Sequence, residues 1–253
     1  GEVFEVLEKK GRKWVRVRCD GDNFVGWIAT DQVKPVTPSE FEEFRHHFAF
    51  SLEVLQAVMA DDHFVPVSLG ARLPLFDGMR FRLGDRFYIF SGQAIFPNEV
   101  EPSVDLVLKV ARRYLNAPYL WGGRSPFGID SSGLVQAVYK IVGYNLPREP
   151  AQQVYMGRSV DFVEQALPGD LAYFENRLGR ISHVGIVLPE GEIIHSLGRV
   201  RIDTFDHFGL YDRESGRYTH KLRVIKRLLP EYSQHIENRE ELDASRSQQF
   251  ELF

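Results

Sequence analysis

Three side chains in the C-terminal half of the chain have the types and the order of a nucleophile with its bases. Ser131 lies in "GIDSSGLVQAVYK", where a loop meets a helical pattern of apolar residues. Backbone N–H groups at the start of a helix point outward and favour an anion, such as a thiolate or a developing oxyanion. His183 in "ISHVGIV" and His195 in "EIIHSL" follow on two successive predicted strands. This set suits acyl transfer by a nucleophile that a histidine deprotonates.

The two histidines are expected to meet across a hairpin. "PEG" between the two strands has the residues of a tight turn, and His183 and His195 lie at nearly equal distances from it. As cross-strand neighbours, one imidazole would take a proton while the other orients it. Structural interpretations stay open, because a serine after an aspartate at a helix start commonly caps the helix, and a strand histidine is commonly only hydrogen-bonded.

A domain of mixed helices and strands is expected to position these residues. "SVDLVLKVARRYL" predicts a helix with Ser103 as its N-cap, and the helix from Ser131 has Asp130 as its cap and Gly143 at its end. Strands follow in "DLAYF", "ISHVGIVL", "EIIHSL", "VRI" and "KLRVIKRLL". Helices followed by hairpin strands indicate an α+β domain over 101–230.

The chain before residue 101 is predicted to contain two small β units joined by a helix. Short strands with Gly and Asp in their turns indicate part of a small barrel over 1–36 and a second barrel over 63–100. Between them, apolar residues at three- and four-residue steps predict a helical linker over 37–62, with Ser39 as N-cap and Glu42 as its capping-box partner. The polar tail at 231–253 is predicted to be a surface helix or partly disordered.

Composition limits the classes of partner. The formal net charge is −4, both signs are spread along the 253 residues, and no basic cluster indicates a nucleic-acid partner. No apolar run is long enough to span a membrane; the first residues lack the pattern of a signal peptide, and the Gly1 start suggests a trimmed sequence. The single cysteine, Cys19, excludes an internal disulfide and a cysteine-based zinc site. No metal or organic cofactor is indicated.

Five motifs in one order resemble the NlpC-type cell-wall peptidases, a papain-like bacterial family. They are "APYLWGGRSPFGIDSSGLVQAVY", "LPREPAQQ", "LPGDLAYF", "ISHVGIV" and "EIIHS", within about residues 103–229. The resemblance implies a papain-like catalytic domain preceded by SH3-like modules, a layout similar to the dipeptidyl-peptidase VI group. Those enzymes cut murein peptides between γ-linked D-glutamate and the diamino acid and require a free N-terminal L-alanine.

The resemblance also implies roles for individual residues. The family pattern at the first helix is Asp-Cys-Ser-Gly, so Ser131 falls on the nucleophilic cysteine, His183 on the base and His195 on the residue that orients the base. Three further positions match family residues near the oxyanion or the substrate: Tyr119, Asp130 and Ser132. The implied partner is a murein tripeptide or tetrapeptide, L-Ala-γ-D-Glu-diamino acid, bound by a monomer. An exported protein of the cell envelope is expected, with a cytoplasmic recycling enzyme as the alternative.

Ser131 is the departure from the family pattern. A papain-like site depends on a thiolate–imidazolium pair, and a serine hydroxyl cannot form that pair near neutral pH. Three interpretations follow: an engineered Cys-to-Ser exchange that leaves a substrate uncut, a natural relative that only binds wall peptides, or a true serine hydrolase. The otherwise intact motifs favour the first, and the absence of G-x-S-x-G disfavours the third. Amidase or acyltransferase chemistry on the same scaffold is a further alternative.

Charged residues elsewhere are candidates for substrate binding. Arg124 and Arg148 lie near the predicted cleft, where either is placed to bind a substrate carboxylate. Four acidic residues at the end of the predicted linker and in the second β unit are candidates for binding the substrate amine, and the sequence does not choose among them: Asp61, Asp62, Asp77 and Asp85.

Overall fold

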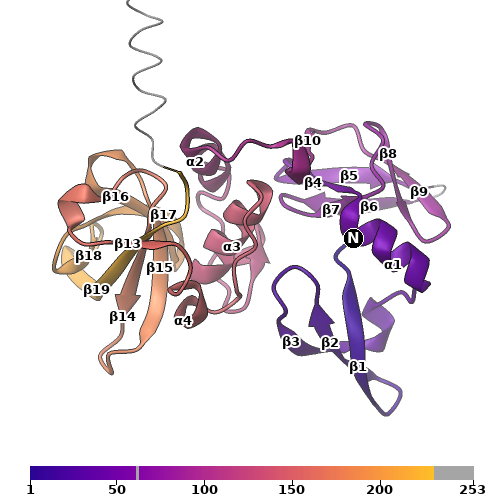
Figure 1. The fold of residues 1–253 in the computed structure, drawn as a ribbon, viewed down its shortest axis with the longest axis horizontal. Helices are drawn as coiled ribbons and strands as arrows, with labels where there is room; N and C mark the ends of the chain where they lie inside the picture. Colours follow the sequence, from indigo (N-terminus) through magenta and orange to yellow (C-terminus); the bar gives the residue numbers. More distant parts are fainter. Residues whose placement is uncertain (61–62, 231–253) are drawn as a thin grey trace, which may run out of the picture.

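A computed structural model describes residues 1–60 and 63–230. Figure 1 shows the strand-rich N-terminal half on one side and the C-terminal domain on the other, with the chain crossing between them just before α2 (Val104–Arg112). Asp61, Asp62 and the predicted tail at 231–253 lie outside the described residues. Over the described ranges, none of the helices has the length and apolar character needed to cross a membrane.

The first unit is a small antiparallel sheet. Its three strands are β1 (Phe4–Lys10), β2 (Trp14–Cys19) and β3 (Val25–Ala29). Val15 and Val17 are buried on β2, whereas the residues between and beside them are exposed, as expected for a sheet with one face packed. A short 3-10 turn, η1 (Thr30–Gln32), follows the last strand.

A capped helix leads from the first unit to the second. α1 (Pro38–His46) begins after Thr37, whose hydroxyl accepts the Glu40 N–H at 3.3 Å while the Glu40 carboxylate accepts the Thr37 N–H at 2.9 Å. This is a capping box, but it lies two residues earlier than the predicted pair of Ser39 and Glu42. The prediction of a helix over 37–62 is wrong beyond His46.

Residues after His46 form strands because their apolar side chains pair within sheets. β4 (Phe48–Ser51) pairs with β7 (Arg72–Pro74) on one edge and β10 (Ala94–Ile95) on the other. β5 (Leu55–Met59) pairs with β6 (Phe64–Ser68). A run this short fits a helical and a strand period equally well, so the partner strands decide its conformation.

Two sheets enclose the core of the second unit. The order in one is β10-β4-β7, and the order in the other is β6-β5-β9-β8, with β8 at Arg80–Leu83 and β9 at Arg86–Ile89. Their inner faces bury Val58, Val67, Leu73, Phe81 and Phe90. Strands of this unit therefore begin at residue 48, inside the predicted linker, and a 3-10 turn, η2 (Pro97–Glu99), follows the last of them.

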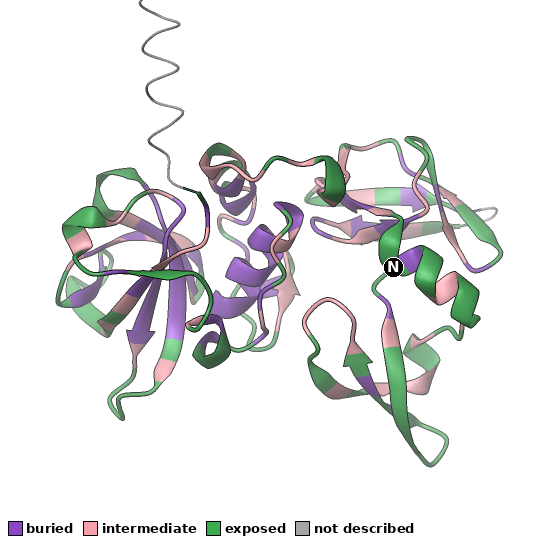
Figure 2. Cartoon of the chain, in the orientation of Figure 1, coloured by how far each residue is buried: buried purple, intermediate pink, exposed green. Residues whose placement is uncertain are grey.

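The two helices predicted for the C-terminal domain are present with their predicted caps. α2 begins after Ser103, whose hydroxyl accepts the Leu106 N–H at 3.3 Å. α3 (Ser131–Ile141) begins after Asp130, whose carboxylate accepts the Gly133 N–H at 2.7 Å. Figure 2 shows α3 buried along almost its whole length, as its nearly continuous apolar sequence requires.

Seven antiparallel strands follow the helices. They are β13 (Arg158–Val160), β14 (Leu171–Glu175), β15 (Ile181–Val187), β16 (Glu192–Leu197), β17 (Arg199–Phe205), β18 (Gly209–Asp212) and β19 (Arg217–Arg227). Because β19 pairs with both β14 and β18, six of the strands close into a ring. The sequence predicted five of the seven, and β13 and β18 are additional. The shorter elements are β11 (Arg124–Ser125), β12 (Gly128–Ile129), α4 (Pro150–Gln153) and η3 (Val163–Gln165).

The ring has an apolar interior with a polar end. All six strands contribute to the interior cluster Ala172, Phe174, Val187, Ile193, Phe205, Leu210 and Ile225. Side chains alternate along a strand, so four titratable residues share the interior face: His183 on β15, His195 on β16, Asp203 on β17 and His220 on β19. The outer face packs on α2 and α3 in the main core of the domain.

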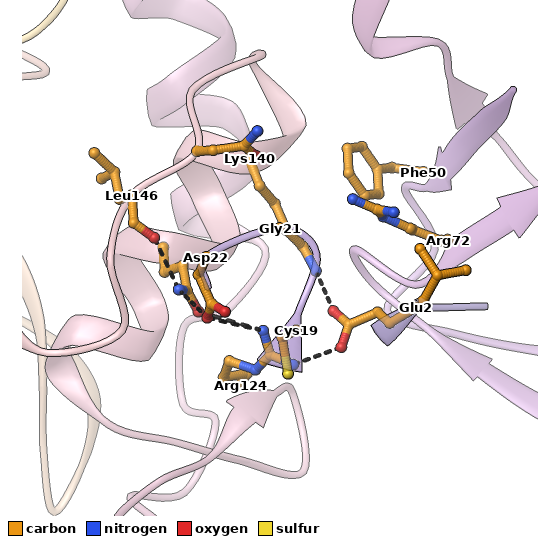
Figure 3. A pocket seen from close by; sticks show the side chains of 12 residues that line it. Glu2, Cys19, Gly21, Asp22, Phe50, Arg72, Arg124, Lys140 and Leu146 are labelled. Carbon is orange, nitrogen blue, oxygen red and sulfur yellow. Dashed lines mark hydrogen bonds and ion pairs between the residues drawn. The ribbon is translucent and has the colours of Figure 1, made fainter. Parts of the chain in front are cut away.

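The N-terminal units contact α3 through polar side chains, as Figure 3 shows. Asp22 in the β2–β3 loop accepts a hydrogen bond from Gln136 on α3 at 2.8 Å. Glu2 pairs with Arg124 at 2.6 Å and with Lys140 at 3.4 Å. These groups surround a cavity of about 30 Å³ that Cys19 also lines. The N-terminal half therefore rests against the helix that carries Ser131.

Candidate active site

The structure brings His183 and His195 together on neighbouring strands. His183 Nε2 lies 2.9 Å from His195 Nδ1, and the two rings meet edge to face with their centroids 5.1 Å apart. The residue directly opposite His195 is Gly185, so the histidines are diagonal neighbours. A Cβ at Gly185 would lie 2.6 Å from the Ile193 side chain, so the glycine makes room for that residue in the hairpin.

The hairpin turn explains the diagonal arrangement. It is η4 (Pro189–Gly191), in which Glu190 and Gly191 have left-handed φ values of 62° and 70°. The pairs nearest the turn are Ile186 with Ile194 and Val187 with Ile193, so the hairpin is centred on residue 190. The sequence placed the centre one residue earlier, and that shift moves the pairing by two residues.

Asp203, which sequence reasoning missed, continues the line beyond His195. His195 Nε2 lies 3.0 Å from Asp203 Oδ2, and neither residue has exposed surface. The Asp203 carboxylate also accepts the Arg213 N–H at 3.0 Å and pairs with Arg201 Nε at 2.9 Å. The only signal in the sequence was its place directly after the predicted strand "VRI", among 35 acidic residues in the whole chain.

Burial keeps both histidines of the line neutral. Burial is the largest cause that lowers the pKa of His183 well below 6.5, and the nearby charges of His195 and His220 act in the same direction. Burial also lowers the pKa of His195, against the opposing effect of the Asp203 carboxylate. Burial opposes ionisation of Asp203, but hydrogen bonds from His195, Arg213 and Arg201 together lower its pKa to about 2. At neutral pH the line therefore holds two neutral imidazoles and one carboxylate.

His220 packs on the other side of His183 and was not singled out by the sequence. The two rings stack with centroids 4.5 Å apart and planes inclined by 23°. His220 Nδ1 lies 3.1 Å from Thr219 Oγ1, and burial lowers the pKa of His220. With Phe174 at 6.1 Å on a third side, the His183 ring is held by contacts from three strands.

Ser131 is the first residue of α3, and its side chain is nearly buried. α3 packs against β15 and β16, and the Ser196 hydroxyl donates to the Ile129 carbonyl at 2.7 Å. This bond links the segment just before α3 to the C-terminal end of β16. Because β15 and β16 are antiparallel, β15 begins beside that end. Among the described residues, no hydrogen bond joins the Ser131 hydroxyl to His183 or to another side chain. Catalytic hydrogen bonds are often long in unliganded sites, so the role of position 131 stays a prediction.

Asp130 and Ser132, on either side of Ser131, belong to a buried polar network. Arg148 donates to both Asp130 oxygens, at 3.0 and 2.6 Å, and to the Ser132 hydroxyl at 2.8 Å. The Gly122 N–H also donates to Asp130 at 2.7 Å. The Arg148 guanidinium is thus held by Asp130 and Ser132, and its binding of a substrate carboxylate stays a prediction. Arg124 is likewise engaged, at the contact with the N-terminal units.

The remaining predicted residues lie in less specific surroundings. Tyr119 forms a backbone bridge to Ile129, two residues before Ser131, and is 44% exposed. Its role near the oxyanion stays a prediction, as do the substrate-binding roles of Asp130 and Ser132. Asp77 accepts two N–H groups of its own turn, from Met79 and Arg80. That carboxylate is therefore engaged locally.

Comparison with known proteins agrees with this arrangement. The model described as NlpC/P60 family matches residues 116–222, and the one described as bacterial dipeptidyl-peptidase Sh3 domain matches residues 1–33. A γ-D-glutamyl-L-lysine dipeptidyl-peptidase of Bacillus subtilis is 33% identical over 212 residues, which cover 78% of this chain and 70% of the relative. The chain belongs to the NlpC/P60 family.

Two further relatives extend the similarity over both halves of the NlpC/P60 chain. The γ-D-glutamyl-L-lysine dipeptidyl-peptidase of Bacillus cereus is 28% identical over 220 residues, which cover 78% of this chain and 65% of the relative. A crystal structure of an NlpC/P60 family protein from Bacillus cereus superposes with a TM-score of 0.77 at 26% identity, covering 91% of this chain and 80% of that one. The fold is thus an NlpC/P60 domain of helices and sheet with an N-terminal SH3-like domain, and the chain spans about two thirds of the two curated relatives.

Proposed function

We propose that this NlpC/P60 scaffold, with a cysteine at position 131, hydrolyses the γ-D-glutamyl–diamino acid bond of short murein peptides that have a free N-terminal L-alanine. We further propose that the serine present at position 131 abolishes this hydrolysis. The observation that carries the proposal is the buried line from His183 through His195 to Asp203, whose first two members lie on β15 and β16, the strands that pack against α3. The names of the two Bacillus relatives support the substrate class.

With a cysteine at position 131, the residues of this chain supply each step of acyl transfer. The thiolate attacks the γ-D-glutamyl carbonyl carbon, and the proton that the thiol gave up resides on His183. His183 returns that proton to the leaving amine, and later takes a proton from the water that hydrolyses the thioester. His195 holds the His183 ring, and the backbone N–H of residue 131 with the Tyr119 hydroxyl stabilises the oxyanion. A nucleophile at the start of a helix with its base on the following sheet makes the domain papain-like.

Serine at position 131 removes the first of these steps. A hydroxyl does not ionise near neutral pH, so it must lose its proton to a base while it attacks the carbonyl. Because the Cβ–O bond of serine is shorter than the Cβ–S bond of cysteine, that base would have to lie closer to the backbone of residue 131. A site built around sulfur leaves the substrate bound and uncut when oxygen takes that position. We favour a Cys-to-Ser exchange of this kind, with a natural wall-binding relative as the alternative.

The N-terminal half is proposed to restrict the substrate. The two β units are interpreted as SH3-like barrels that wall off one end of the cleft, so that a short peptide enters and an intact murein strand does not. The contact of Asp22 with Gln136 on α3 supports this placement. We propose that the monomer acts in the cell envelope, with cytoplasmic recycling as the alternative.

Three variants at one position test the proposal. The chain itself, Ser131→Cys and Ser131→Ala are each incubated with L-Ala-γ-D-Glu-L-Lys, and the released dipeptide is quantified. Ser131→Cys is expected to release L-Ala-D-Glu, whereas the chain with serine is expected to match Ser131→Ala. Ser131→Ala is the matched control, because it removes the hydroxyl and leaves the rest of the site unchanged.

Each other outcome identifies one alternative. If Ser131→Cys folds and binds the tripeptide without cutting it, the scaffold is a binding module and the proposal fails. Cleavage by the chain with serine that exceeds Ser131→Ala would establish a serine hydrolase. N-acetyl-L-Ala-γ-D-Glu-L-Lys is expected to resist Ser131→Cys, and its cleavage would remove the requirement for a free amine.

A further inference from the structure

We propose that Asp203 is a positioning residue that sets the ring protons of both histidines, so that His183 presents an unprotonated Nδ1 to residue 131. Asp203 is fully buried and acts through His195. The consequence for hydrolysis rests on the proposed function, whereas the positions of the ring protons do not.

The first step is that Asp203 can only accept hydrogen bonds. Its Oδ1 lies 3.0 Å from Arg201 Nη2 and 3.0 Å from the Arg213 backbone nitrogen, and its Oδ2 lies 2.9 Å from Arg201 Nε. All three neighbours are N–H donors, and none can accept a hydrogen bond from the O–H of a protonated carboxyl group. Asp203 is therefore held as a carboxylate, and the remaining contact of Oδ2, at 3.0 Å to His195 Nε2, requires a proton on that nitrogen.

The second step carries this polarity along the line. A neutral imidazole has one ring proton, so a proton on His195 Nε2 leaves a lone pair on His195 Nδ1. That nitrogen lies 2.9 Å from His183 Nε2, which must then donate. His183 is also neutral, because burial disfavours its charged form and lowers its pKa well below 6.5. Its other nitrogen, Nδ1, is left as an acceptor, which is the state that a general base requires.

The third step explains why an asparagine cannot substitute. An amide nitrogen at the Oδ1 position would face two donors, Arg213 N–H and Arg201 Nη2. At the Oδ2 position it would face only Arg201 Nε and would donate to His195 Nε2. The second orientation has fewer donor–donor conflicts, so asparagine reverses the line. His183 then carries its proton on Nδ1, the nitrogen that does not contact His195, and cannot act as a base through that atom.

The first experiment needs no substitution in the line. ¹⁵N-histidine is incorporated into the chain, and two-bond ¹H–¹⁵N correlation spectra assign the tautomer of each ring at mildly alkaline pH. The charged or titratable groups packed around the two rings are His220 on β19, Arg201 on β17 and Asp212 on β18. Both His183 and His195 are expected as the Nε2–H tautomer. A proton on Nδ1 of either ring would overturn the proposal.

The second experiment reverses the line by substitution. Asp203→Asn is expected to move the proton of both rings to Nδ1, and in the Ser131→Cys background to lower kcat on the order of 10²–10⁴-fold. The matched control is Asp206→Asn, three residues along, whose carboxylate bonds its own loop and the Tyr218 hydroxyl. It is expected to leave tautomers and kcat unchanged. Thermal unfolding of each variant confirms that the chain is folded.

The readouts separate this inference from the proposed function. If Ser131→Cys is inactive but both rings carry Nε2–H and reverse in Asp203→Asn, the proposed function fails and the role of Asp203 stands. If Asp203→Asn lowers stability and kcat without moving either ring proton, Asp203 is a structural residue and the inference is overturned.

Discussion

The buried imidazoles make the stability of the protein depend on pH. Burial, with the charges of His195 and His220, lowers the pKa of His183 in the folded chain below its ordinary 6.5. Burial lowers the pKa of His195 in the same direction. Below pH 6.5 the unfolded chain therefore binds protons that the folded chain does not, and the free energy of unfolding falls as the pH falls.

Urea unfolding between about pH 8 and about pH 5 measures this effect, with a slope of at most about 1.4 kcal/mol per pH unit for each histidine whose pKa burial lowers, His220 included. Asp203 does not add to this slope. The stability that its ionised carboxylate contributes is lost only as the pH falls toward its pKa of about 2, below the range measured. His195→Gln removes one titrating ring and is expected to flatten the slope. A free energy of unfolding that stays constant or rises on acidification would show that the two rings are not neutral in the folded chain.

At the same scale, motifs identified the residues of the line unevenly. His183 and His195 stand in recognisable strand motifs, and the hairpin between them makes their contact predictable. Asp203 has no such motif. It meets His195 because β16 pairs with β17, and the sequence of a short polar strand does not show which strand it will pair with. The ion pair of Arg148 with Asp130 was missed for a related reason, because the two residues are 18 positions apart and no local pattern links them.

The start of α3 depends on one buried ion pair. Arg148 and Asp130 are joined through two hydrogen bonds, with side-chain exposures of 9% and 10%. Arg148→Met leaves the Asp130 carboxylate buried without its counter-charge and is expected to lower the free energy of unfolding by about 3–5 kcal/mol, measured by urea. The matched control is Arg18→Met at the exposed Glu5 pair, with an expected loss below about 1 kcal/mol. Equal losses for the two variants would show that the buried pair does not stabilise α3.

Capped helices were predictable from sequence, whereas the strands of the second unit were not. α2 and α3 combine an N-cap with a sustained apolar period, and these local signals specify a helix without reference to the rest of the chain. "FAFSLEVLQAVM" has apolar residues that fit a helix of similar length, yet it forms β4 and β5. Its conformation is decided by pairing with strands up to about 45 residues away, which no local pattern contains.

Across the whole molecule, the order of units was predictable but their contacts were not. Changes in periodicity from strands to helices and back separate the N-terminal half from the α+β domain. The contact between them involves Glu2, Asp22 and Arg124, which have no distinguishing sequence context and pair over more than 100 residues. Long-range ion pairs of this kind are recognised only once the units are in place.

Gln136 is one of the α3 side chains that bond to the N-terminal half, together with Lys140. Its amide donates to Asp22 at 2.8 Å and to the Leu146 carbonyl at 2.9 Å, and it is 4% exposed. Gln136→Met keeps the volume but leaves both acceptors without a donor, so urea unfolding is expected to show a loss of about 1–3 kcal/mol. Gln56→Met, whose amide bonds only within the second unit, is the matched control, with an expected loss below about 1 kcal/mol. If the first loss is no larger than the second, the contact contributes nothing to stability and the N-terminal half is held on α3 by other groups.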